Sequence, residues 1–481
     1  MVFAKYIGGE WRASSADPLV NVNPSDTSDV IGEFSCASPG DVSEAIEAAA
    51  GATDSWGSTR PVERAEILDR VADEIASRKG ELADLLSREE GKTLAEATGE
   101  VDRASRIFRY FANAAVSAPG EVLPSVRDGL QAYVTREPVG TVALITPWNF
   151  PIAIPAWKIA PALAFGNTVV FKPAELVPAS AWHLTDILVR AGVPGGVFNL
   201  VMGRGSDIGD VLTGSHLIDA VSFTGSVNTG RRVLASAQQH MAKVQLEMGG
   251  KNPLIIADDA DIDVAVDIAI DSAYVQTGQR CTAASRIIVM DPIHVEFLDR
   301  FVERAKAIVV GDARDPKTTM GPVASEQQLD IDLRYCDIAR SDGAEVIGGE
   351  RVESSKSGNY LTPAVVLGST NKDRINTEEV FGPVTSIIPV GSYDEAVDMA
   401  NDTRFGLSSG IVTTSLSKSE DFRRASRAGM VMVNAPTAGV DFHVPFGGRK
   451  GSSYGGREQG FAARDFFTSV KTNYVAPGRP V

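Results

Sequence analysis

The sequence predicts an α/β protein built from parallel sheets with crossover helices. Short β-branched runs alternate with helical windows after about residue 136, and polar motifs stand where several of these runs end. A chain of 481 residues is too long for one simple core, so two or three structural units are expected. The two glycines and the proline of "LEMGGKNP" favour a boundary near residue 250 between two α/β units.

The segment from about residue 41 to residue 115 is expected to be helical. Ile67, Val71 and Ile75 recur at i, i+4 and i+8, which places them on one apolar face of a helix. Pro61 suits the first turn of that helix, where its missing N–H costs no hydrogen bond. This region therefore predicts a helical N-terminal part that precedes the first long strand.

Short runs rich in valine and isoleucine are the strand candidates of the remaining chain. They are residues 141–146, 167–172, 197–202, 220–225, 253–258, 285–290, 386–390 and 429–434. Sheets of this kind place their chemistry in the loops just past the carboxyl ends of the strands. One more strand is expected at residues 467–476, isolated from any helix and available to pair with another subunit.

Composition and charge exclude several classes of function. The net charge of −16 argues against a nucleic-acid partner, and no apolar stretch reaches the roughly 18 uninterrupted residues of a membrane span. No secretory signal is visible, and three distant cysteines form neither a disulfide framework nor a paired zinc motif. We expect a cytoplasmic protein without a bound metal. The 14 lysines against 32 arginines and the acidic excess indicate ordinary solubility or a salt-rich cytoplasm.

A glycine-containing turn follows the strand candidate at 220–225. Gly225, Ser226 and Gly230 lie in "FTGSVNTG", where backbone N–H groups and the dipole of the next helix could hold a pyrophosphate. The usual GxGxxG pattern is missing, so an ordinary strand–helix turn is the alternative. In "FKPAE" (171–175), Lys172 and Glu175 could hold an adenosine ribose, and a solvated turn is the alternative.

Three further residues are candidates for catalysis. Asn149 lies in "TPWNFP" (146–151), where two prolines fix a turn from which its amide could donate to an oxyanion or cap the turn itself. Glu247 stands between apolar residues in "LEMGG", so it is either a buried general base with a raised pKa or an exposed loop residue. Cys281, between Arg280 and Thr282, is expected in a partly exposed, electropositive setting that lowers the thiol pKa, without the apolar neighbours of a core cysteine.

Together these motifs resemble the aldehyde dehydrogenase superfamily. "TPWNFP", "FKPAE", "FTGS", "LEMGGKNP", "GQRC", "EEVFGPV" (378–384) and "PFGG" (445–448) stand in the order of that family, and the resemblance runs from about residue 5 to the C-terminus. It implies a Rossmann-variant cofactor domain, an α/β catalytic domain, a small β oligomerisation arm, and a homodimer or homotetramer. The implied domains are residues 1–118 with 141–250, residues 251–440, and residues 119–140 with 460–481.

The resemblance also implies a role for each site residue. Cys281 is the nucleophile, Asn149 and the backbone N–H of Cys281 form the oxyanion hole, and Glu247 activates the water that hydrolyses the thioester. The implied cofactor-binding residues are Trp148, Lys172, Glu175, Gly225, Ser226, Gly230, Glu379 and Phe381. Of these, Lys172 and Glu175 lie at the adenosine ribose, Ser226 at the pyrophosphate, and Glu379 and Phe381 at the nicotinamide ribose and ring.

Within the family, "GQRCTA", "QLEMGGKNP" and "KPAEL" most resemble the branch that oxidises 2-oxoglutarate semialdehyde (2,5-dioxopentanoate) to 2-oxoglutarate in pentose and sugar-acid catabolism. Succinate semialdehyde, glutarate semialdehyde or another aldehyde are the alternatives. Arg280, or another nearby arginine, is expected to bind the distal carboxylate; Arg280 could instead pair with an acidic neighbour. Glu175 argues for NAD because it repels a 2′-phosphate, yet it can swing outward and leave Lys172 to pair with that phosphate. NADP is favoured slightly over NAD.

Three other functions are compatible with parts of the pattern. A cysteine hydrolase or esterase would use Cys281 without a dinucleotide. A non-catalytic binding protein would be expected to have lost Cys281, Asn149 or Glu247, and the chain has all three. An acyl-CoA-forming enzyme would not need Glu247 as a base.

Overall fold

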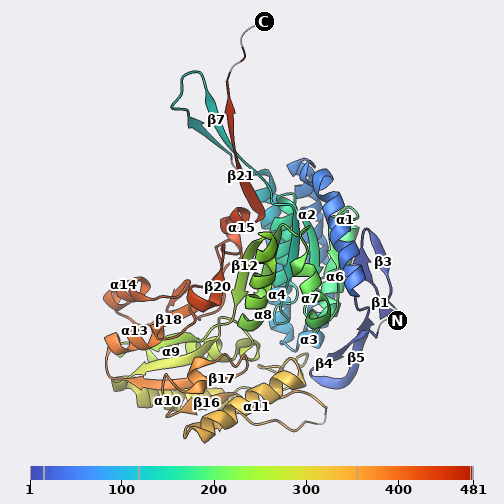
Figure 1. Cartoon of the computed structure of the whole chain (residues 1–481). Helices are drawn as coiled ribbons and strands as arrows, with labels where there is room; N and C mark the ends of the chain where they lie inside the picture. The colour runs from blue at the N-terminus through green and yellow to red at the C-terminus, as the bar shows by residue number, and fades with distance from the viewer. Residues whose placement is uncertain (1, 15–16, 118–119, 355, 477, 479–481) are drawn as a thin grey trace.

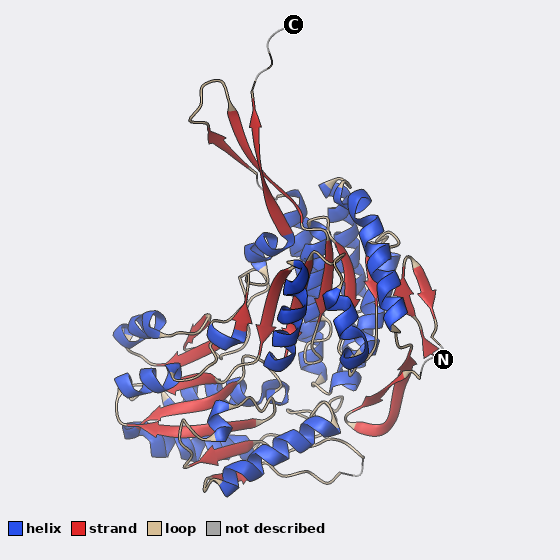
Figure 2. Ribbon diagram, viewed as in Figure 1, coloured by secondary structure: helices blue, strands red, loops and turns tan. Residues whose placement is uncertain are grey.

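The computed structural model describes residues 2–14, 17–117, 120–354, 356–476 and 478. Two large sheets with helices on both faces form the body of the molecule, and a narrow arm of strands projects from it (Figure 1). Figure 2 shows the same alternation of helices and strands in both layers, which confirms the predicted α/β class.

The first sheet has the strand order β20–β12–β11–β8–β9–β10–β2–β3. The strands from β12 to β10 are parallel, whereas β20, β2 and β3 pair antiparallel with their neighbours. The strands are β2 (Lys5–Ile7), β3 (Glu10–Arg12), β8 (Thr141–Ile145), β9 (Thr168–Lys172), β10 (Phe198–Leu200), β11 (Ala220–Gly225), β12 (Lys243–Met248) and β20 (Ser453–Tyr454).

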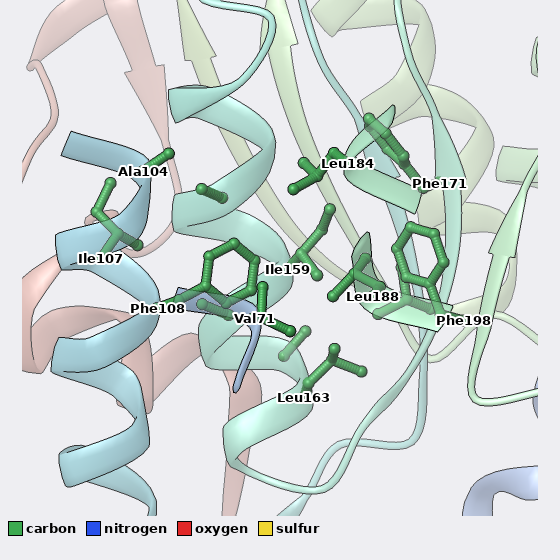
Figure 3. Close-up of a cluster of buried hydrophobic side chains, with 14 of the residues drawn as sticks. Val71, Ala104, Ile107, Phe108, Ile159, Leu163, Phe171, Leu184, Leu188 and Phe198 are labelled. Atoms are coloured by element: carbon green, nitrogen blue, oxygen red, sulfur yellow. The ribbon is translucent and has the colours of Figure 1, made fainter. Parts of the chain in front are cut away.

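Helices cover both faces of this sheet, and the alternation of side chains in β8 shows it. Val142 and Leu144 pack into the cluster formed with α2 to α6, whereas Ala143 packs against α1, α7 and α8. Figure 3 shows part of the first cluster, in which Val71, Phe108 and Ile159 meet. The helices are α1 (Pro39–Gly57), α2 (Pro61–Ser77), α3 (Lys79–Glu90), α4 (Leu94–Val116), α5 (Ala153–Ala164), α6 (Pro178–Arg190), α7 (Gly205–Gly214), α8 (Val227–Ala237) and the short η1 (Gln238–His240).

The predicted helical segment is confirmed by α1 to α4. Ser38 and Thr93 begin α1 and α4 with capping boxes, in which a hydroxyl accepts from the third helical N–H. Pro61 is the first residue of α2, and the predicted stripe of that helix faces inward. Burial of this stripe positions α4, which reaches the candidate site described below.

The second sheet has the order β15–β16–β17–β14–β13–β18–β19, parallel except at β15. Its strands are β13 (Asn252–Ile256), β14 (Ala284–Met290), β15 (Glu345–Gly348), β16 (Ala364–Leu367), β17 (Val384–Val390), β18 (Ser408–Val412) and β19 (Met430–Val433). Its helices are α9 (Ile262–Tyr274), η2 (Val275–Gly278), α10 (Asp291–Lys306), α11 (Glu326–Ser341), α12 (Arg374–Thr377), α13 (Tyr393–Asn401) and α14 (Leu416–Ala425).

Two small sheets complete the fold. The N-terminal sheet contains β1 (Val2–Phe3), β4 (Leu19–Asn23) and β5 (Asp26–Phe34). The arm contains β6 (Glu121–Pro124), β7 (Gln131–Pro138) and β21 (Thr468–Val475), in the order β21–β7–β6. The described chain also includes α15 (Gly460–Phe467) and the short η3 (Lys450–Ser452).

The expectation that the last strand stands isolated from any helix is wrong. Helix α15 leads directly into β21, because Phe466 and Phe467 are buried and anchor that helix against the core. Strand β21 pairs along its length with β7 of the same chain. Its outer edge has no neighbouring strand in the described chain, so pairing with another subunit stays a prediction.

The assignment of three domains also stays a prediction. Residues 1, 118, 119 and 479–481, which include several of the predicted boundaries, lie outside the described residues. In the part of the chain that is described, no helix has the length and apolar character needed to cross a membrane.

Candidate active site

The candidate site lies at the carboxyl edge of the first sheet. Parallel pairing aligns Ile145 of β8 with Lys172 of β9, and Gly225 of β11 with Met248 of β12, so the loops after these strands meet at one edge. A cavity of about 360 Å³ opens there. The predicted site residues that line it are Trp148, Asn149, Gly225, Ser226, Glu247, Cys281, Glu379 and Phe381.

Cys281 follows a strained segment, η2, in the connection that leads to β14. Gln276, Thr277 and Gly278 all have positive φ angles, of 56°, 57° and 66°. For the two non-glycine residues this conformation is uncommon, and the surrounding structure must hold it. The carboxylate of Glu96 accepts from the backbone N–H of Gln276 at 2.7 Å, and the Thr277 hydroxyl donates to a backbone carbonyl of another segment. The position of Cys281 is therefore fixed from several sides.

Carboxylates surround the thiol. Burial raises the pKa of Cys281 to about 12, and the nearby carboxylates of Glu379, Glu247 and Glu458 act in the same direction. The side chain also packs against a small apolar cluster. The expected electropositive setting with a lowered thiol pKa and no apolar neighbours is therefore wrong. The reason is tertiary: the three carboxylates come from distant parts of the chain, and the guanidinium of Arg280 is held elsewhere.

Asn149 is buried in the turn after β8 and faces the Cys281 loop. Its side-chain Nδ2 donates to the backbone carbonyl of Gln279 at 2.9 Å, two residues before Cys281. The backbone carbonyl of Asn149 accepts from the ammonium of Lys92 at 2.8 Å. The amide thus spans two loops and does not cap its own turn. Because a carboxamide carries two N–H groups, one donor remains for a ligand in the cavity.

Glu247, at the end of β12, is buried, as the general-base interpretation requires, and is not an exposed loop residue. Its Oε2 accepts from the hydroxyl of Ser453 at 2.5 Å, and its Oε1 has no hydrogen-bond partner among the described residues. Burial, followed by the neighbouring carboxylate of Glu458, raises the pKa of Glu247 well above its usual range. A carboxyl with a raised pKa keeps its proton to a higher pH than an exposed one and, once ionised, is a stronger base.

A buried pair behind the cavity was missed by sequence reasoning. Lys158 and Glu458 form an ion pair, the Trp157 indole donates to Glu458 at 2.8 Å, and Lys158 donates to the Ser222 hydroxyl at 2.8 Å. A signal existed for Lys158, because it is the one charge in the apolar helix "AIPAWKIAPALA". Glu458 had no local signal, because it lies some 300 residues further along the chain.

A second missed pair supports the Asn149 turn. Lys92 and Glu100 are buried and meet at 2.5 Å. The other oxygen of Glu100 accepts from the backbone N–H groups of Ile152 and Ala153, at 2.9 and 3.0 Å, at the start of α5. The Lys92 ammonium lies 4.3 Å from the centre of the Phe150 ring. The pair therefore fixes the loop that carries Asn149, and nothing in the local sequence around either residue indicates it.

The predicted phosphate turn forms the N-terminus of α8. Ser226 is the N-cap residue, and its hydroxyl accepts from the backbone N–H of Thr229 at 3.3 Å. The positive end of the helix dipole therefore points toward the cavity that Gly225 and Ser226 line. Gly230 does not line it: a Cβ there would come within 2.5 Å of the Met248 sulfur, so this glycine permits close packing of α8 on the sheet.

Lys172 and Glu175 lie at the same sheet edge but outside the lining of this cavity. Lys172 is buried, its ammonium donates to the Pro173 carbonyl at 3.1 Å, and burial lowers its pKa. Glu175 is exposed. The arrangement leaves both residues able to contact the far end of a long ligand that begins at Ser226.

Glu379 and Phe381 reach the cavity from the second sheet's side. Glu379 accepts from the backbone N–H of Gly250 at 2.9 Å, and burial raises its pKa to about 7. Phe381 has a φ angle of 68°, and its ring meets Trp148 edge-on with 5.3 Å between ring centres. The two halves of the molecule thus contact each other across the cavity.

A second cavity, of about 280 Å³, also reaches Cys281. It shares Ile154, Trp157 and Phe446 with the first, but it is lined by Arg280 and other residues in place of the predicted cofactor set. Cys281 therefore stands between two separate openings.

Arg280 is engaged with its own surroundings. Its guanidinium lies 3.8 Å from the carboxylate of Asp271 and donates to the backbone carbonyls of Asp271 and Ser272 at the end of α9. Of the two hypotheses for Arg280, the geometry favours pairing with an acidic neighbour.

Comparison with known proteins gives consistent relatives. The model described as "Aldehyde dehydrogenase family" matches residues 11–473. An alpha-ketoglutaric semialdehyde dehydrogenase from Bacillus subtilis is 43% identical over 99% of this chain and 98% of its own length. An alpha-ketoglutarate semialdehyde dehydrogenase from Haloferax volcanii is 42% identical over 98% of each chain. A solved betaine aldehyde dehydrogenase from Staphylococcus aureus, in complex with NAD+, has a TM-score of 0.96 at 34% identity, covering 99% of this chain and 96% of its own. Relatives named for different substrates thus share this fold.

Proposed function

Because this chain belongs to the aldehyde dehydrogenase family, we propose that it oxidises an aldehyde to a carboxylic acid through a cysteinyl thioester, with NAD(P) as the second substrate. One observation carries the proposal: a single cavity brings together a thiol, a fixed amide and a buried carboxyl from three distant loops. The test is growth of reduced-nicotinamide absorbance when aldehyde is added to enzyme and NAD or NADP. If the enzyme consumes aldehyde without any rise in reduced-nicotinamide absorbance, the proposed function is wrong.

The residues present fit a dinucleotide. The helix N-terminus at Ser226 offers backbone N–H groups to a pyrophosphate, and the cavity continues from there past Glu379 and Phe381 to Cys281. When bound, the oxidised cofactor supplies the hydride acceptor and a positive charge that opposes the carboxylates around the thiol. Ser226, Glu379 and Phe381 would hold it, with Lys172 and Glu175 at its adenosine end.

The chain's own residues account for the bond changes. The Cys281 sulfur, after losing its proton, adds to the aldehyde carbon, and the carbonyl oxygen takes the negative charge of a thiohemiacetal. The free N–H of Asn149 stabilises this oxyanion, a contact worth about 3 kcal/mol in comparable sites. Oxidation leaves a thioester on Cys281. Glu247 then takes a proton from water, the resulting hydroxide attacks the thioester carbon, and the carboxylic acid leaves as the thiol re-forms.

We infer that the substrate is 2-oxoglutarate semialdehyde. The curated relatives named for this aldehyde span nearly the whole chain, including a 2,5-dioxopentanoate dehydrogenase from Saccharolobus solfataricus at 37% identity over 97% of this chain. Succinate and glutarate semialdehydes are the competing substrates of the same acidic class. A betaine aldehyde dehydrogenase from Bacillus subtilis, 36% identical, represents the cationic alternative. A panel of these aldehydes, compared by kcat/KM, tests the assignment.

We propose NADP as the preferred cofactor, by a small margin over NAD. Lys172 is buried without a carboxylate in ion-pair distance among the described residues, so a 2′-phosphate would compensate its charge. The exposed Glu175 can turn to solvent. Against this, solved structural neighbours hold NAD+. Initial rates with the two cofactors at matched concentration decide the preference.

We also propose a cytoplasmic homodimer or homotetramer assembled through the arm. The outer edge of β21 is unpaired in the described chain, and Val470, Tyr474 and Val475 are exposed on it. The cysteines at 36, 281 and 336 are free thiols, as a reducing compartment would maintain. Light scattering after size exclusion measures the assembly, and a monomer would contradict it.

Neither cavity is lined by a histidine in the described chain, so nothing there favours a cysteine hydrolase.

A further inference from the structure

Arg103, on α4, faces the second cavity beside Cys281. Its guanidinium carbon lies 5.7 Å from the centre of the Trp157 ring, and one terminal nitrogen donates to the side-chain oxygen of Gln459 at 3.1 Å. Its Nε is buried and has no hydrogen-bond partner among the described residues. The guanidinium is thus oriented by an aromatic face and one amide while part of its donor fork stays free.

This cation also lacks a counter-ion. No carboxylate of the described chain lies within ion-pair distance of Arg103. Burial lowers the pKa of Arg103, which reflects the cost of holding its charge away from water. An arginine nevertheless stays protonated in proteins. The Arg103 side chain is half-buried, so its unpaired charge is partly desolvated, and a ligand that brings the opposite charge gains from pairing with it.

The other charges around this cavity are already engaged. Glu100 is paired with Lys92, Glu96 accepts from the backbone N–H groups of Thr93 and Gln276, and Arg280 is held at the end of α9. Among the described lining residues, Arg103 is therefore the charge left to meet a ligand.

Resting on the proposed aldehyde oxidation, we propose that Arg103 binds the distal carboxylate of an aldehyde whose carbonyl carbon lies at Cys281. The substrate class is then a short semialdehyde of a dicarboxylic acid. Two N–H groups of the guanidinium match the two oxygens of a carboxylate, and the buried side-chain nitrogen of Gln459, which has no partner in the described chain, offers a further donor nearby. The apolar side chains of Ile154, Val440 and Phe446 line the space for the carbon chain. The same cation disfavours an aldehyde that carries a positive charge.

The test compares Arg103→Ala with wild type on an acidic and a neutral aldehyde of equal length, 2-oxoglutarate semialdehyde and pentanal. Loss of a charge-assisted contact should raise KM for the acidic aldehyde on the order of 10- to 100-fold, while kcat/KM for pentanal stays within about twofold. Arg106→Ala, an exposed arginine on the same helix, is the matched control and should change neither. Arg103→Lys should recover part of the lost affinity, because it restores the charge without the fork.

Inhibition by glutarate, measured against pentanal, gives a second readout that does not require turnover of the acidic aldehyde. Wild type should bind glutarate more tightly than Arg103→Ala does, whereas the two enzymes should bind pentanoate about equally. If Arg103→Ala lowers kcat/KM equally for both aldehydes, Arg103 does not recognise the carboxylate. The same holds if only Arg280→Ala selectively lowers kcat/KM for the acidic aldehyde. If wild type oxidises neither aldehyde with NAD or NADP, the proposed function itself fails. If it oxidises pentanal and not the acidic aldehyde, the acidic class fails and the dehydrogenase assignment stands.

Discussion

Ser453 donates a hydrogen bond to the Glu247 carboxylate at 2.5 Å, across the antiparallel pair formed by β20 and β12. The bond favours the ionised form of a carboxyl whose pKa burial raises. It brings a residue from near the chain's end into contact with the proposed general base, more than 200 residues earlier in the sequence. The protonation of Glu247 therefore depends on β20.

Ser453→Ala should move the pH dependence of thioester hydrolysis. Removing the donor raises the Glu247 pKa further, so the base form is lost at higher pH and activity near neutrality falls. A shift of about 1 pH unit corresponds to the usual strength of such a bond. Steady-state hydrolysis of a p-nitrophenyl ester, which needs no dinucleotide, gives the pH below which the hydrolysis rate falls. Ser453→Thr keeps the hydroxyl and should not shift this pH. If the alanine variant shows the same pH dependence as wild type, Ser453 does not control the protonation of Glu247.

Cys281→Ala should abolish aldehyde oxidation, with a loss of at least roughly 1,000-fold in kcat, because no other group can carry the acyl intermediate. The measurement is the initial rate of cofactor reduction at saturating aldehyde. Cys36→Ala removes a different half-buried thiol and should leave the rate unchanged. Turnover that survives in the Cys281 variant would overturn the proposed mechanism.

Asn149→Ala should lower kcat by about 100- to 1,000-fold with a much smaller effect on KM, because the amide acts on the oxyanion and not on the bound aldehyde. Steady-state kinetics separates the two parameters. Asn113→Ala, on the exposed side of α4, is the control. A rise in KM at constant kcat would show that the amide only binds substrate.

Glu379→Gln should accelerate alkylation of Cys281 by iodoacetamide in the cofactor-free enzyme. After burial, the Glu379 carboxylate is the first charged group that raises the Cys281 pKa, and its removal lowers that pKa. Because the pKa of Glu379 is itself about 7, the gain in thiolate is expected above about pH 7, where Glu379 is ionised. Mass spectrometry of the peptide that contains Cys281 gives the rate against pH. Glu378→Gln alters a neighbouring carboxylate that faces Arg374 and should have no effect. Equal rates in both variants would rule out the carboxylate as the cause.

Lys92→Met should destabilise the fold strongly, because it leaves the Glu100 carboxylate buried without its cation. The expected loss in the free energy of unfolding is about 3–5 kcal/mol. Lys79→Met breaks an exposed pair with Asp102 at 3.3 Å and should cost no more than about 1 kcal/mol. Differential scanning calorimetry of the two variants compares their Tm values; similar Tm values would contradict the structural role of the buried pair.

The fold could be predicted where local pattern and burial agree. The run at 220–225 coincides with β11, and the run at 285–290 lies within β14, because both are apolar strands between helices. Strand β18 was not predicted: Ser408–Val412 begins with two serines and a glycine, which are poor strand formers, and only pairing with β13 and β19 makes it a strand.

The candidate site shows a similar division. Asn149 and Glu247 carried local signals, a proline-bracketed turn and a carboxylate among apolar residues. The charge around Cys281 had no such signal, because tertiary packing brings Glu379 and Glu458 to it from distant segments. The same holds for the pairing of Lys158 with Glu458. Local sequence therefore identified groups able to react, whereas their protonation depends on contacts that no short segment contains.

The arm imposes an order on biosynthesis. Strand β7 pairs with β21, some 330 residues later, so a nascent chain on the ribosome cannot complete the arm before residues 468–475 have been translated. Ser453 and Glu458 are translated shortly before β21. The surroundings of the reactive sulfur are therefore finished at nearly the same moment as the arm, which leaves little time for half-made chains to associate.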